Sequence, residues 1–231
     1  TTAAYAIFNM ANAAADDQKS QAILATALKN TTGATDAQVA SVEELISKMQ
    51  MAAGISDTEL RTGFQNLARA TGDVTKAQDL LTLATDISVG TGKSLETVTL
   101  GLSKAYQGNL GSLKRLGIPL DENIVKTKDF DAATRVLSDT FGGSAANAAD
   151  TYAGKMAITQ QKIDEAKETI GALFIPVIEQ LTDVLGPAAE GVATLADAFS
   201  SLKAKAESAN GVLGKTFDLL NPLAFFNLSK I

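Results

Sequence analysis

The stretch SVGTGKSL contains Gly92, Lys93 and Ser94, the residue types that close a phosphate-binding P-loop. In such a loop, backbone N–H groups surround the phosphates, the lysine reaches the outer phosphates and the hydroxyl binds Mg²⁺. The motif needs a further glycine five residues before Gly92, but this sequence has Ile87 there. The spacing therefore argues against a P-loop. It predicts a helix that ends at a glycine of this stretch and a second helix capped by Ser94.

The other side chains exclude most catalytic chemistry, because the chain has no Cys and no His. Triads built on Ser-His-Asp or Cys-His and metal sites built on histidine or thiolate therefore cannot form. A site made only of carboxylates stays open, although no EF-hand loop is present. We expect a protein that is not an enzyme and that needs no cofactor or metal ion.

Two pairs of adjacent carboxylates, Asp16–Asp17 and Glu43–Glu44, could in principle act on a glycosidic bond. On a helix, neighbouring residues point about 100° apart. No aromatic platform for a sugar accompanies either pair, and the chain has no Trp. We therefore expect both pairs to lie on solvated helix faces.

The composition favours an acidic, helical protein with a core of its own. Hydrophobic residues make up 45% of the 231 residues but aromatic residues only 5%, whereas strands need aromatic and β-branched enrichment. The formal charge is −6, and no basic stripe marks a nucleic-acid surface. No specific nucleic-acid binding is predicted. The longest apolar run with large side chains, Ile170 to Ile178, is shorter than the roughly 20 residues that span a bilayer.

Capping residues and apolar periodicity divide the first part of the chain into short helices. Ser56 and Glu59 have the spacing of a capping box, and Asp73 is placed to cap the helix that follows Gly72. We expect seven helices, over residues 3–30, 36–53, 56–72, 73–92, 94–108, 109–117 and 129–141. Residues 1–143 are therefore predicted to form a compact helical portion.

From Ser144 no turn signal interrupts the chain for a long way, which predicts an extended helix. Apolar residues recur there with a period of seven, at Met156, Ile163, Ile170, Val177 and Val184. This period favours a coiled-coil seam, and we expect self-association through it as a trimer. The same stripe also fits an intramolecular core.

The fold class is therefore all-α, a compact multi-helix portion followed by a long coiled-coil helix with a bend at Pro176. Residues 144–210 form the extended helices with the heptad seam, and residues 211–231 form an amphipathic C-terminal segment. That segment suits partner docking or membrane contact, and equally a last helix folded on the core.

Several motifs in a fixed order resemble the helical region of tail tape measure proteins of long-tailed bacteriophages. They are ATGDVTKAQDLL, TGKSLETV, KAYQGN, LKRLG and YAGKM, and the similar stretches cover Phe64 to Asp121 and Phe141 to Leu181. Members of that family are usually much longer, which implies a short tail or a processed or partial chain.

The resemblance implies a virion protein located in the lumen or tip of the tail and assembled in the bacterial cytoplasm. It would help to set tail length, take part in assembly and DNA ejection, and contact the tail tube and the tail-tip or baseplate hub proteins. An alternative is a membrane-active delivery protein that lines a DNA channel in the host envelope through its C-terminal segment.

Overall fold

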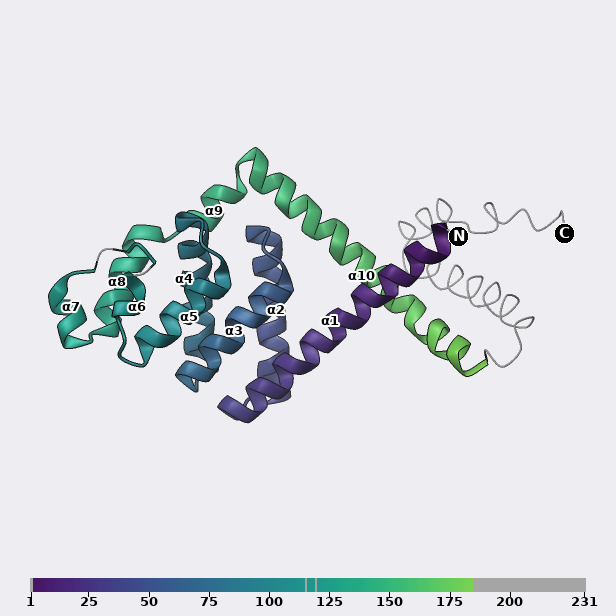
Figure 1. Cartoon of the computed structure of the whole chain (residues 1–231), viewed down its shortest axis with the longest axis horizontal. Helices are drawn as coiled ribbons and strands as arrows, with labels where there is room; N and C mark the ends of the chain where they lie inside the picture. Colours follow the sequence, from purple (N-terminus) through teal and green to yellow (C-terminus); the bar gives the residue numbers. More distant parts are fainter. Residues whose placement is uncertain (1, 115, 119, 185–231) are drawn as a thin grey trace. The chain divides into compact units, whose positions relative to one another are not determined.

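A computed structural model describes residues 2–114, 116–118 and 120–184. Every regular element among these residues is an α-helix, so the predicted all-α fold is confirmed (Figure 1). The helices are α1 (Thr2–Thr32), α2 (Asp36–Ala53), α3 (Asp57–Thr71), α4 (Val74–Thr91), α5 (Leu95–Tyr106), α6 (Gly111–Lys114), α7 (Glu122–Thr127), α8 (Phe130–Phe141), α9 (Ser144–Ala149) and α10 (Tyr152–Val184).

The chain divides into two compact units, which are described separately. The larger unit comprises residues 17–164, and the described part of the smaller unit comprises residues 2–16 and 165–184. The predicted boundary at residues 143 and 144 thus falls inside the larger unit. The predicted amphipathic segment, residues 211–231, lies outside the described residues, as do residues 185–210 of the predicted stretch of extended helices.

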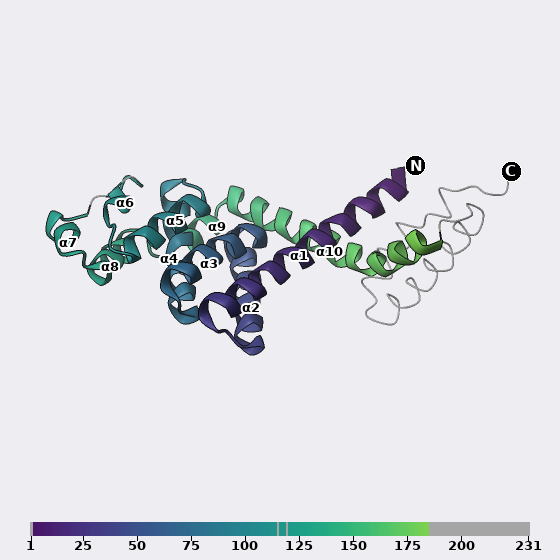
Figure 2. The same cartoon turned by 60° about the horizontal axis from the view of Figure 1, so that its bottom comes forward.

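The core of the larger unit lies where α3, α4 and α5 pack on one another (Figures 1 and 2). Phe64 of α3, Leu81 of α4 and Leu102 of α5 are fully buried there. Gly63 lets α3 and α5 approach closely, because a Cβ at this position would lie 3.1 Å from the methyl of Thr99. Apolar residues three and four positions apart on each helix supply this interior.

Most helix ends lie where their capping residues predicted them. The side chains of Ser56, Asp73 and Ser94 each accept a hydrogen bond from the backbone N–H three residues further on. Gly54 and Gly72 end α2 and α3 in the left-handed conformation, each with φ of 67°. Glycine adopts this conformation without steric cost.

α2 covers the predicted residues 36–53, and a capping box fixes its start. Thr35 is the N-cap, because its hydroxyl accepts from the Gln38 N–H at 3.3 Å. The Gln38 side chain in turn accepts from the Thr35 N–H at 2.9 Å. This reciprocal pair is a capping box that uses Gln at its third position.

Residues 109–127 differ from the prediction in two ways, a shorter sixth helix and an additional helix. The sixth helix spans only Gly111–Lys114 instead of residues 109–117. The next helix, α7, was not expected at all, although Asp121 caps it by accepting from the Asn123 N–H at 2.7 Å.

The predicted uninterrupted helix from Ser144 is broken after six residues. α9 ends at Ala149 and α10 begins at Tyr152. Thr151 supports the restart, because its hydroxyl accepts from the Gly154 N–H at 3.0 Å. Gly154 is required at this corner, since an added Cβ would collide with the carbonyl of Ala148.

The N-terminus of α9 is held by a residue of another helix. Gly143 precedes α9 and has no side chain to cap it. Instead, the carboxylate of Asp86 on α4 accepts hydrogen bonds from the N–H groups of Gly143 at 3.1 Å and Ala145 at 3.0 Å. α9 is thereby fixed to α4.

The smaller unit forms where the first half of α1 packs on the second half of α10. Ala11 and Phe174 are buried there, with Ile7 and Ile170 packed against them. The two backbones lie so close that a Cβ at Gly171 would collide with the carbonyl of Met10. Pro176 lies inside α10, and the predicted bend there stays a prediction.

Candidate functional site

The GTGKS stretch forms a helix end, a turn and a helix start, as its spacing predicted. α4 ends at Thr91, Gly92 follows in the left-handed conformation with φ of 68°, and Ser94 caps α5. The Ser94 hydroxyl, which would bind Mg²⁺ in a P-loop, accepts a hydrogen bond from the Thr97 N–H at 3.3 Å. Ile87, the residue at the position of the missing glycine, is fully buried in the core.

The two carboxylate pairs do not lie wholly on solvated faces, which corrects the prediction. One member of each pair turns inward to a buried arginine that the sequence analysis did not single out, Arg61 on α3. Its Nη1 donates to Asp17 on α1 at 2.6 Å, and its Nε donates to Glu43 on α2 at 3.0 Å. Their neighbours Asp16 and Glu44 are exposed. Adjacent helical residues point about 100° apart, so only one member of each pair reaches the interior.

A third carboxylate completes this group, which we call the Arg61 cluster: Arg61, Asp17, Glu43 and Asp57. Arg61 Nη1 donates to Asp57 at 2.6 Å, one turn earlier on α3. The spacing of Asp57 and Arg61 by four residues was the one sequence signal for this cluster. The cluster joins α1, α2 and α3 by charge-assisted hydrogen bonds.

The electrostatics of the Arg61 cluster follow from one cation facing three anions. Burial alone lowers the pKa of Arg61, but the carboxylates of Asp57, Glu43 and Asp17 raise it overall, so the guanidinium stays charged. Burial and a hydrogen bond with Asp57 raise the pKa of Asp17 above its ordinary value, against the opposing effect of Arg61. The cluster serves to hold three helices together.

The predicted seam residues lie in different environments. Met156 is 53% exposed and Ile163 is 46% exposed, both in the larger unit. Ile170 instead packs within the smaller unit, as the intramolecular interpretation expected. The side chains of Val177 and Val184 lie outside the described residues.

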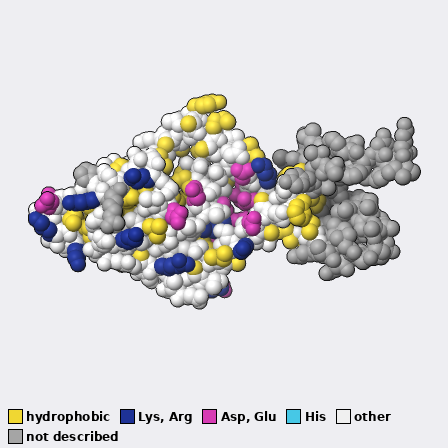
Figure 3. Space-filling view, in the orientation of Figure 1, with side chains coloured by type: hydrophobic (Ala, Val, Ile, Leu, Met, Phe, Trp, Pro, Cys, Tyr) yellow, Lys and Arg dark blue, Asp and Glu magenta, His cyan; other side chains and the backbone are white. Residues whose placement is uncertain are grey.

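Tyr152, which the sequence analysis did not include, extends the exposed part of the stripe and is 82% exposed. It lies four residues before Met156, on the same side of the helix. We call Tyr152, Met156 and Ile163 the outer face of α10. Exposed apolar side chains are visible at the start of α10, at the top of Figure 3.

The opposite side of α10 contacts the end of α2. Ala157 and Ile158 lie about 100° and 200° around the helix from Met156. A Cβ placed on Gly54, at the end of α2, would be 3.0 Å from the Ala157 Cβ and 3.1 Å from the Ile158 nitrogen. This close contact directs the outer face of α10 toward solvent.

Two lysines border the outer face of α10 on one side. Lys155 and Lys162 each precede a face residue by one position, and both are exposed. Neither makes an ion pair with any carboxylate in the described part of the chain. On the other side, Gln160 donates to the carboxylate of Asp164 at 3.0 Å. The lysine side therefore carries unmatched positive charge.

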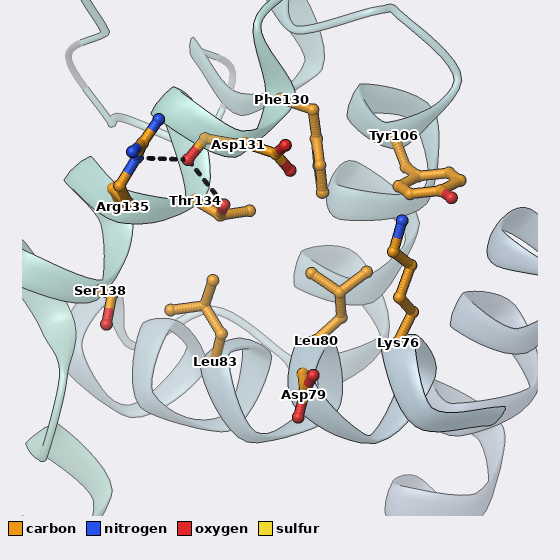
Figure 4. Close-up of a pocket in the computed structure, with 10 residues that line it drawn as sticks. All are labelled: Lys76, Asp79, Leu80, Leu83, Tyr106, Phe130, Asp131, Thr134, Arg135 and Ser138. Carbon is orange, nitrogen blue, oxygen red and sulfur yellow. Dashed lines mark hydrogen bonds between the residues drawn. The ribbon is translucent and has the colours of Figure 1, made fainter. Parts of the chain in front are cut away.

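A groove of about 350 Å³ lies between α4 and α8 (Figure 4). Its floor is apolar, and charged and hydroxyl groups stand around its rim. The lining residues are Lys76, Asp79, Leu80, Leu83, Tyr106, Phe130, Asp131, Thr134, Arg135 and Ser138.

The aromatic end of this groove is packed internally. The rings of Tyr106 and Phe130 meet edge to face at 5.2 Å, and the Lys76 ammonium lies 5.5 Å from the Tyr106 ring centre. At the other end, Arg135 donates to the backbone carbonyl of Asp131 at 3.3 Å. Cations and carboxylates alternate around the rim, so the groove selects no particular charge, and we assign it no function.

No family model matches this sequence, and comparisons with curated proteins and with solved structures give no significant match. Among the residues that the structure describes, no helix is both long and apolar enough to cross a membrane. The feature of the described chain best suited to a function is therefore the outer face of α10.

Proposed function

We propose that this protein is a structural component of a phage tail that resembles a tape measure protein and acts by packing helices against other tail proteins. The outer face of α10 is the observation that carries this proposal. A folded helical unit that leaves three large apolar side chains exposed in a row is typical of an interaction surface. The ordered motifs that resemble those of tape measure proteins suggest where such a partner is found.

The helical architecture supports a mechanical rather than a chemical role. The segment closest to a nucleotide-binding motif is occupied by helix caps, and the buried charges of the Arg61 cluster join helices. In a tail, such a protein would contribute length. A fully helical chain of 231 residues would extend roughly 350 Å, which is an upper limit for a chain with a folded bundle.

Composition and length of purified tails test this proposal. We expect mass spectrometry to find the chain in assembled tails. In-frame deletion of whole heptads between Ile163 and Val184 should shorten the tail by about 10 Å for each heptad removed, since a helix rises about 1.5 Å per residue. Unchanged tail length would contradict a role in setting tail length. Absence of the chain from purified tails would contradict its assignment to the tail.

Self-association as a trimer through the seam is a competing proposal for the same face of α10. Ile170 packs inside the smaller unit, so its substitution would report on folding as well as on assembly. Ile163 is the better probe because it is exposed. If the seam joins copies, Ile163→Asp should lower the sedimentation mass of the full chain, and an unchanged mass would contradict a trimer through this residue.

A further inference from the structure

The residues of the outer face of α10 and of its border indicate which side chains a partner would need. This inference rests on the proposed function, in which the face contacts tail proteins. We propose that the outer face of α10 binds an amphipathic helix of another protein whose apolar stripe is bordered by acidic residues. Three observations carry the proposal: the exposed apolar stripe, its position opposite the Gly54 contact, and the two lysines beside it.

The apolar stripe has the geometry of one half of a helix pair. Successive face residues follow at intervals of four and seven, which keeps them within about 40° of one another around the helix. Tyr152 and Met156 take the d and a positions of a heptad, and Ile163 takes the next a position. A partner with the same period would cover all three side chains.

The packing of α10 on α2 leaves this face open. Ala157 and Ile158 occupy the inner side against Gly54, where a Cβ would lie 3.0 Å from the Ala157 Cβ. This contact does not involve Tyr152, Met156 or Ile163, whose exposed fractions are 82, 53 and 46%.

The bordering charges disfavour a second copy of this chain as the occupant. Lys155 and Lys162 occupy g positions, where charges on neighbouring helices set partner choice. In an antiparallel pair of copies, Lys155 would meet Lys162 of the other copy, and in a parallel pair Lys155 would meet Gln160. Neither arrangement neutralises the lysines, whereas a helix with Glu or Asp along that edge would pair with them.

Two synthetic helical peptides of about four heptads test this directly with the full-length chain. Both carry Leu and Ile at the seam positions, and one has Glu and the other Lys at every e and g position. Fluorescence anisotropy should show roughly tenfold tighter binding of the Glu peptide, because each lysine contributes one attractive instead of one repulsive pair. The preference should shrink as salt screens the charges.

Charge reversal provides the matched variant. Lys155→Glu with Lys162→Glu should transfer the preference to the Lys peptide, whereas Lys104→Glu with Lys114→Glu, which changes two exposed lysines elsewhere, should leave it unchanged. Ile163→Asp should weaken binding of both peptides. All these positions are exposed, and an unchanged circular dichroism melt will confirm that each variant folds.

The proposal is overturned if the two peptides bind equally, if neither binds, or if charge reversal leaves the preference in place. It is also overturned if the chain alone sediments as an oligomer that Ile163→Asp dissociates, since the occupant is then a second copy. These results leave the tail assignment untouched, because that assignment depends on the composition of purified tails.

Discussion

The Arg61 cluster and the outer face of α10 each place side chains where their type is unusual, charged groups away from solvent and apolar groups in it. At Arg61, a buried guanidinium and three buried or half-buried carboxylates bond to one another across α1, α2 and α3. On α10, large apolar groups lie in solvent beside lysines that have no carboxylate partner in the described chain. The first arrangement is complete within one molecule, and the second is, in our proposal, completed by a partner.

This difference separates residues that stabilise the fold from residues that are available for binding. Burial makes a charged group costly unless it is paired, so every member of the Arg61 cluster depends on the others. Exposure makes an apolar group nearly neutral for folding, so the outer face of α10 is free to vary with its partner. The following predictions test this separation, from the largest expected effect to the smallest.

Arg61→Met should have the largest effect, because it leaves three carboxylates facing one another without a cation. We expect the free energy of unfolding to fall by about 3–5 kcal/mol. The matched control is Lys48→Met, which breaks the exposed pair with Glu44 and should cost less than about 1 kcal/mol. Urea unfolding measures both. Equal losses in the two variants would mean that the cluster does not hold the helices together.

Gly54→Ala and Gly72→Ala form a second matched pair. Both glycines have φ of 67°, so each substitution strains the backbone by about 1–2 kcal/mol. Only Gly54 also packs against α10, at 3.0 Å from the Ala157 Cβ, whereas nothing lies within 4 Å of a Cβ at Gly72.

The loss of unfolding free energy should therefore be larger for Gly54→Ala. Hydrogen exchange should also show faster opening at the start of α10 in that variant alone. The same loss in both proteins would show that the contact between α2 and α10 contributes nothing to stability.

Asp17→Asn tests the excess of negative charge in the Arg61 cluster. Because the folded protein raises the pKa of Asp17, the stability this residue contributes is fully present below its ordinary pKa of 3.8 and is lost as pH rises through the raised value. Asparagine has no proton to lose there.

The unfolding free energy of Asp17→Asn relative to the natural protein should therefore increase as pH rises from below about 3.8 toward neutrality. Urea titrations across that range measure the difference. A difference that stays constant or decreases with pH would contradict the raised pKa.

Met156→Ser with Ile163→Ser should have the smallest effect on stability. Both side chains are about half exposed, so we expect a change within about 0.5 kcal/mol per site. Ile46→Ala, at a fully buried position, should instead cost about 2–5 kcal/mol. A large loss in the serine variant would mean that the outer face of α10 is part of the core.

The sequence was most informative where structure depends on neighbours along the chain. Ser56, Asp73 and Ser94 were predicted as caps and act as caps, because each cap bonds to a residue three positions away. Gly54 and Gly72 ended their helices for an equally local reason. The all-α fold could be predicted because helix caps and apolar periodicity are also patterns among neighbouring residues.

The sequence was least informative where structure depends on distant residues. Arg61 reaches Asp17 across 44 positions, and nothing in the local pattern distinguishes Asp17 from its exposed neighbour Asp16. The break between α9 and α10 depends on Thr151 and on the close corner at Gly154, without the proline or Asn-Gly signal that usually marks a turn. The heptad period predicted a stripe, but only packing shows that Ile170 is covered and Ile163 is not.

The bonds from Asp86 to the start of α9 have a consequence for how the position of α10 is maintained. A helix of six residues does not persist alone in water, so α9 is stable only together with α4, whose carboxylate caps it. The start of α10 follows directly on α9 and therefore depends on this cap. A chain still being synthesised, or one that has misfolded, would not display the outer face of α10 in its docked position. Assembly through this face would then select molecules in which the helical bundle is already folded.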